Sequence, residues 1–88
     1  MAWTIEFVPA ARKELKKLGR AEASRIIGTL ETRIAARDDP RELGSALVGE
    51  LGGLWRWRIG DYRVVARIED ERITILVVRV AHRREVYR

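Results

Sequence analysis

The chain has 88 residues, 47% of them hydrophobic, and its 18 Lys and Arg residues against 13 Asp and Glu give a formal net charge of +5. This length fits a single domain, residues 1–88, and the hydrophobic content argues against a disordered chain. The absence of cysteine excludes disulfides and cysteine-ligated zinc, and with one histidine we expect neither a metal site nor a cofactor.

Nothing in the sequence has the pattern of a signal peptide or a membrane span. The longest apolar run, 73–80, is interrupted by Thr74 and Arg79 and is too short to cross a bilayer. We therefore expect a cytoplasmic protein without membrane contact. Its excess positive charge favours acidic or phosphate-rich partners.

The first half of the chain has the pattern of one strand and two helices. Residues 3–8 alternate apolar and polar side chains, which indicates a half-buried strand, and Pro9 suits the first turn of a helix over 10–18. Gly19 then ends this helix. Apolar residues at helical spacing predict a second helix over 21–37, and two helices joined at a glycine predict an antiparallel helical hairpin.

The second half has the pattern of a connector followed by three strands. Residues 39–53 are rich in glycine, and strands are expected at 54–59, 62–69 and 72–80. We predict an α+β fold of order βααβββ. The helical hairpin packs on one face of a mainly antiparallel four-stranded sheet, and a short C-terminal turn or helix follows.

The first hairpin sets a register that separates apolar residues from arginines. A two-residue loop at Gly60-Asp61 places Ile59 opposite Tyr62. Because side chains alternate across a sheet, one set then faces the helices: Trp55, Trp57, Ile59, Tyr62, Val64, Ala66 and Ile68. The opposite side, here called the arginine face, carries Arg56, Arg58, Arg63 and Arg67.

A second hairpin around Asp70-Glu71 extends this arrangement. It is expected to pair Ile68 with Ile73 and to keep Ile75 and Val77 on the core side. Thr74, Leu76, Val78 and Val80 would then line the arginine face. If the chain stays extended, His82 joins them.

Four arginines on neighbouring strands favour an anion site. Like charges directly opposite one another destabilise a sheet, so the set is unusual for a face that meets only water. The alternative is a solvated face over which Glu50 or Glu69 folds. Taken together, the four side chains favour binding of a polyanion, with RNA as the best candidate.

Two residues of the tail have polar side chains suited to chemistry. His82 has an unperturbed pKa near neutrality and can exchange protons, although a lone histidine is often only a surface residue. Tyr87 follows Arg83 by four residues, so one helical turn would place both on one side. The alternative for Tyr87 is an aromatic side chain that covers the edge of the core.

The chain resembles the RelE family of toxins from toxin–antitoxin operons. The resemblance is carried by LWRWRIGDYRVV at 54–65 and VAHRREVY at 80–87, and it extends over the whole chain through length, charge and element order. It implies a ribosome-dependent endoribonuclease that cleaves mRNA without metal. The ribose 2′-hydroxyl would attack the adjacent phosphate.

The resemblance also implies roles for individual residues. Arg63 would hold the scissile phosphate, and Arg83 would stabilise it and help the leaving group. Tyr87 would be the base, with His82 as a second acid–base candidate. Further RNA contacts would come from Arg56, Arg58, Arg67 and Arg84.

Two other functions remain open on the sequence. The superfamily includes ParE-type toxins that inhibit DNA gyrase, and a catalytically degenerate RNA-binding domain would have the same pattern. The resemblance implies a cognate antitoxin from the same operon as a partner, besides the ribosome and mRNA. It also implies a toxin–antitoxin complex that reaches operator DNA through the antitoxin.

Overall fold

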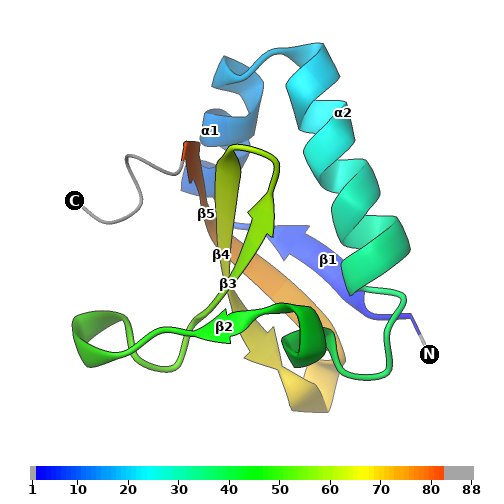
Figure 1. Cartoon of the computed structure of the whole chain (residues 1–88), viewed down its shortest axis with the longest axis vertical. Coiled ribbons are helices and arrows are strands. Elements are labelled where there is room, and N and C mark those ends of the chain that lie inside the picture. Colours follow the sequence, from blue (N-terminus) through cyan, green and yellow to red (C-terminus); the bar gives the residue numbers. More distant parts are fainter. Residues whose placement is uncertain (1, 83–88) are drawn as a thin grey trace.

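A computed structural model describes residues 2–82, which form a five-stranded sheet with two helices on one of its faces (Figure 1). The strand order is β1-β5-β4-β3-β2. The strands are β1 (Thr4–Phe7), β2 (Ser45–Ala46), β3 (Trp55–Ile59), β4 (Tyr62–Glu69) and β5 (Thr74–His82). In the part of the chain described, no helix is long and apolar enough to cross a membrane.

The predicted α+β architecture is confirmed, but the predicted number of strands is wrong. The sheet gains β2, which pairs Ser45 and Ala46 with the start of β3. Two residues within a glycine-containing connector are too few for a period-two pattern to reveal them. The sheet is mixed, because β1 runs parallel to β5 while the other pairs are antiparallel. The predicted C-terminal turn or helix lies outside the described residues.

Two helices form the predicted hairpin. The first, α1 (Pro9–Lys17), begins at Pro9, whose missing N–H costs nothing in the first turn. Gly19 has φ 88° and joins it to α2 (Arg20–Thr29). The predicted second helix ends earlier than residue 37, because α2 widens into a π-helical turn at Leu30–Ile34.

Three short 3-10 helices complete the part of the chain between residues 2 and 82. They are η2 (Pro40–Leu43), η3 (Gly49–Leu51) and η4 (Asp70–Arg72). The segment around η3 projects from the body of the molecule between β2 and β3 (Figure 1). It carries Val48, of which 85% is exposed.

The main core lies between the helices and the sheet, as the register predicted. Trp57, Ile59, Val64 and Ala66 are buried there, and Ile75 and Val77 are fully buried beside them. The helices contribute Ala11, Leu15, Ile26 and Leu30. Burial of these side chains is the main stabilising contribution in a chain this short.

The second hairpin departs from the predicted register. Residues 70–72 form η4, and Ile73 follows with φ 48°, so the turn is longer than two residues. Ile68 therefore pairs with Ile75 and not with Ile73. This shift of two residues preserves which side faces the core, so Leu76 lies on the arginine face as expected, although its partner is now Arg67.

A β-bulge then changes the side of the sheet to which each residue at the end of β5 points. Ala66 pairs with Val77, but Val65 pairs with Arg79, so Val78 is an extra residue. Val80 consequently lies opposite Val64 in the main core. The prediction that Val80 and His82 line the arginine face is therefore wrong.

Candidate nucleic-acid interface

The first hairpin assembles the arginine face as predicted. Arg58 pairs with Arg63, and Arg56 pairs with Val65. Alternation along both strands places these residues on the side away from Trp57 and the helices. The sheet therefore brings four predicted arginines to one surface, including one directly opposed pair.

The four arginines differ in burial, which separates their chemical roles. Arg63 is 7% exposed, Arg56 is half-buried, and Arg58 and Arg67 are exposed. A guanidinium that is buried is less screened by water than an exposed one, so its charge acts more strongly on a nearby anion. Packing also restricts its rotamers. Arg63 is thus the member best suited to hold an anionic group in one position, and the exposed arginines provide longer-range attraction.

A small second core covers part of this side of the sheet. Val65 and Ala81 are buried there, and Leu47, Leu54 and Val78 pack against them. Leu47 comes from the connector and Leu54 directly precedes β3, so the connector folds over the sheet next to the arginine face. This second core was not predicted from the sequence, although Val65 and Val78 are apolar residues expected on the arginine face and were a signal for it.

The arginine face extends around the free edge of β3. Only Trp55 and Arg56 pair with β2, so the edge of β3 beyond them has no neighbouring strand among the described residues. Arg58 lies on this edge. It lines a pocket of about 130 Å³ together with Thr29, Arg33, Ile34, Leu43 and Trp57.

Arg25 is a further cation at this end of the sheet that the sequence analysis missed. Its guanidinium, from α2, lies so close to Gly60 that a Cβ there would clash with it. Arg25 also forms an ion pair with Glu22 at 3.8 Å. The helical spacing of α2 gave no sign of this contact, which depends on how the helix packs over the hairpin.

His82 lies on the helix side of the sheet, at the end of β5. It pairs with Tyr62, and the two rings meet edge to face with centroids 5.8 Å apart. A pocket of about 400 Å³ adjoins it, lined by Glu14, Lys17, Leu18, Tyr62, Val80 and Ala81 as well as His82. The neighbour of Arg63 on β5 is therefore Ala81.

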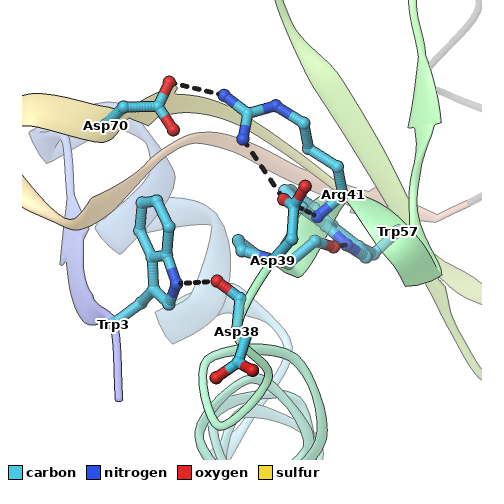
Figure 2. Close-up of polar contacts among 7 residues, drawn as sticks. Trp3, Asp38, Asp39, Arg41, Trp57 and Asp70 are labelled. Atoms are coloured by element: carbon cyan, nitrogen blue, oxygen red, sulfur yellow. Dashed lines mark hydrogen bonds and ion pairs between the residues drawn. The ribbon is translucent and has the colours of Figure 1, made fainter. Parts of the chain in front are cut away.

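Polar contacts fasten the connector beside β3 (Figure 2). Arg41 Nη2 donates to Asp70 Oδ2 at 2.6 Å, and Arg41 Nη1 donates to Asp39 Oδ1 at 3.2 Å. The hydrogen bond from Arg41 lowers the pKa of Asp70, and the same bond raises the pKa of Arg41. Trp3 Nε1 donates to the Asp38 carbonyl at 3.1 Å.

Glu69 does not serve as a counterion over the arginine face. Its carboxylate accepts a hydrogen bond from Arg72 Nη1 at 2.5 Å. Arg72 also donates to both carboxylate oxygens of Glu6, and these contacts raise the pKa of Arg72. The alternative in which Glu69 folds over the arginines is therefore not what the structure contains.

The remaining predicted site residues, Arg83, Arg84 and Tyr87, lie outside the described residues. The structure therefore leaves their proposed contribution untested. Among the predicted residues that it describes, Arg56, Arg58, Arg63 and Arg67 share a face, and His82 is on the other.

Known proteins match this chain over nearly its full length. A family described as ParE toxin of type II toxin-antitoxin system, parDE, matches residues 5–87. The chain belongs to the RelE/ParE superfamily of type II toxins. Toxin RelG of Mycobacterium tuberculosis is 36% identical to it over 91 residues, which cover 100% of this chain and 99% of that protein. Toxin RelE of the same organism is 35% identical over 78 residues, covering 77% of this chain and 80% of that protein.

Solved structures of RelE/ParE toxins confirm the fold. The toxin–antitoxin complex RelBE2 from M. tuberculosis matches with a TM-score of 0.84 and 30% identity, over 93% of this chain and 92% of that chain. A mutant of the E. coli toxin RelE, solved in complex with an antitoxin RelBc peptide, matches with a TM-score of 0.69 and 27% identity. That match covers 93% of this chain and 84% of the E. coli chain.

Proposed function

We propose that this RelE/ParE toxin is a ribosome-dependent mRNA endoribonuclease that works without a metal ion. The observation that carries the proposal is the buried Arg63 within a face of four arginines, on a chain similar to toxins RelG and RelE over most of its length. A buried cation beside exposed cations suits a phosphate that must be held in one place on a longer polyanion.

The proposed reaction is an internal transesterification of RNA. The ribose 2′-oxygen attacks the adjacent phosphorus, its proton passes to a base, and the bond from phosphorus to the 5′-oxygen breaks. The 5′-oxygen takes up a proton, so the products are a 2′,3′-cyclic phosphate and a 5′-hydroxyl. Arg63 and Arg83 stabilise the charge that develops on the phosphorane oxygens, and Arg83 also assists the leaving group.

Of the two candidate bases, we favour Tyr87. The β-bulge places His82 on the helix side, next to Tyr62, whereas Arg63 belongs to the opposite face. A phosphate held by Arg63 is therefore on the other side of the sheet from the imidazole. A phenol can act as a base where nearby positive charge favours the phenolate, and the arginine face is the side of the sheet that supplies such charge.

A cognate antitoxin is the proposed protein partner. Structures similar to this chain include toxin–antitoxin complexes from M. tuberculosis and E. coli. The net charge of +5 would steer an acidic antitoxin segment toward the toxin. In that arrangement the antitoxin covers the arginine face and brings the complex to operator DNA.

Brief induction of the toxin in cells, followed by mapping of transcript ends on ribosomes, tests the nuclease. We expect cuts within codons and cyclic phosphate ends. These are lost in Arg63→Ala and Arg83→Ala but kept in Arg20→Ala, which removes the same charge from an exposed position on α2. Circular dichroism checks that each variant folds. Cleavage that persists in the Arg63→Ala, Arg83→Ala double variant would remove the proposed chemistry.

The second candidate function is inhibition of DNA gyrase. It is favoured by one observation, that the matching family is described as ParE toxin. In that case transcripts stay intact while DNA supercoiling changes after induction. A degenerate toxin domain would instead bind RNA in a salt-dependent manner without arresting growth.

A further inference from the structure

Among residues 2–82, no strand lies beside the last part of β5 on one of its two sides. β1 pairs with β5 from Thr4–Thr74 to Phe7–Val77, and the Val8 N–H donates to the Val77 carbonyl at 3.0 Å. At Pro9 the chain turns into α1, so this side of β5 has no strand beside it after Val77 among the described residues. A buried backbone N–H on that edge needs another acceptor, because leaving it unsatisfied is costly.

Glu14 of α1 supplies that acceptor. Its Oε1 accepts a hydrogen bond from the Val80 N–H at 2.8 Å, and its Oε2 lies 3.5 Å from Arg79 Nε. Val80 is 1% exposed, whereas 30% of the Glu14 side chain is exposed. One carboxylate thus contacts two consecutive residues of β5 immediately after Val78, the extra residue of the bulge.

The segment that Glu14 holds leads directly into the candidate site. After the bulge, Val80 pairs with Val64, Ala81 pairs with Arg63, and His82 pairs with Tyr62. Ala81 is small and buried, and it is the direct cross-strand neighbour of the arginine proposed to bind phosphate. A strand end without a partner on one side frays easily, so a contact at Val80 limits the movement of Ala81 and His82.

We propose that Glu14 is a positioning residue for the nuclease site. It replaces the missing strand beside β5 and fixes the register of residues 80–82 against the Arg63 strand. The effect of Glu14 on RNA cleavage rests on the proposed nuclease function. The effect of Glu14 on the end of β5 does not depend on that function.

Two substitutions at this position separate the hydrogen bond from the charge. Glu14→Gln and Glu14→Met remove the same negative charge and have similar size, but only glutamine keeps an oxygen that can accept from the Val80 N–H. Glu22→Gln on α2 is the matched control, because Glu22 forms only an exposed ion pair with Arg25 among the described contacts. Any effect of net charge on RNA affinity is then common to all three variants.

Amide hydrogen exchange of the free toxin provides the first readout. We expect the Val80 amide to exchange at least about ten times faster in Glu14→Met than in Glu14→Gln, while amides of β3 and β4 keep their rates. Glu22→Gln should match the unsubstituted chain throughout. Equal Val80 exchange in the two Glu14 variants would overturn the proposal.

Cleavage of ribosome-bound mRNA provides the second readout. The kcat of Glu14→Met should be at least about tenfold below that of Glu14→Gln, with an equal KM, because only the geometry of the site differs. Faster Val80 exchange with equal kcat would reduce Glu14 to a structural residue and overturn its positioning role. If the unsubstituted toxin cleaves no RNA, the nuclease proposal fails, and the exchange rates alone decide whether Glu14 holds β5.

Discussion

The indole Nε1 of Trp57 lies 3.0 Å from the carbonyl oxygen of Pro40 and donates a buried hydrogen bond to it. This bond ties the connector to β3 in the interior of the molecule (Figure 2). Gly44 then passes the same indole so closely that a Cβ there would lie 2.9 Å from Trp57 Nε1 and 3.2 Å from the Arg56 carbonyl oxygen. The approach of the connector to β3 therefore depends on the absence of a side chain at Gly44.

Gly44→Ala should lower the free energy of unfolding by about 1–3 kcal/mol, since the added methyl must displace a buried ring or the backbone of β3. Gly28→Ala is the control, because a Cβ at Gly28 meets no atom within 4 Å and lies in α2. That substitution should stabilise by about 0.5–1 kcal/mol. Urea unfolding measures both, and equal stabilities would contradict the close approach.

The Arg41–Asp70 contact should make stability depend on pH at the acidic end. Because the folded state lowers the pKa of Asp70, its contribution is fully present above the unfolded pKa of about 3.9 and is lost as pH falls through the folded value. Asp70→Asn should therefore be less stable than the unsubstituted chain at pH 7, and the difference should shrink as the pH falls below the unfolded pKa.

Urea unfolding at a series of pH values measures this difference. Glu71→Gln, an exposed neighbour in η4, is the matched control, because it removes one carboxylate from the same segment and leaves the Arg41–Asp70 hydrogen bond in place. Both charges of the Arg41–Asp70 pair are accessible to solvent, so the effect should be small and should shrink in high salt. A difference that does not shrink at any pH below the unfolded pKa would argue against the ion pair.

The two candidate bases can be separated by substitution. Tyr87→Phe should reduce kcat by about 10²–10⁴-fold, the range typical for loss of a general base. His82→Ala should reduce it by less than about tenfold, because the imidazole lies on the helix side beside Tyr62. Single-turnover cleavage of ribosome-bound mRNA gives both numbers. The reverse order would assign the base to His82.

Deletion of Val78 should be tolerated, because it removes the extra residue of the bulge and leaves Arg79 opposite Val65. The half-buried valine is lost from the second core, so unfolding should become easier by about 1–2 kcal/mol. Cross-strand NOEs between Val64 and Val80 should persist. Deletion of Val64, where β4 has no extra residue, should prevent folding because it turns core side chains outward.

The sequence predicted the part of the fold that short-range patterns control. The Gly60-Asp61 loop determines the pairing of Trp57 with Val64, and with it the arginine face. The bulge could not be predicted, because Val77, Val78 and Val80 are all apolar and a run of apolar residues does not show which side each one faces. Glu14 was missed for another reason: its contact with Val80 spans 66 positions and depends on how α1 packs beside β5.

The extra residue in β5 shows that strand length, and not only sequence, determines where a motif after β5 lies along β4. Strand residues advance by about 3.3 Å each, so an insertion or deletion that no bulge absorbs moves the terminal motif by one step along β4 and leaves its sequence unchanged. Relatives with identical HRREVY-like endings but different strand lengths would then bring different side chains alongside the arginine of the hairpin. Divergence of activity within this superfamily can therefore arise from insertions and deletions in the last strand, with the recognisable residues left intact.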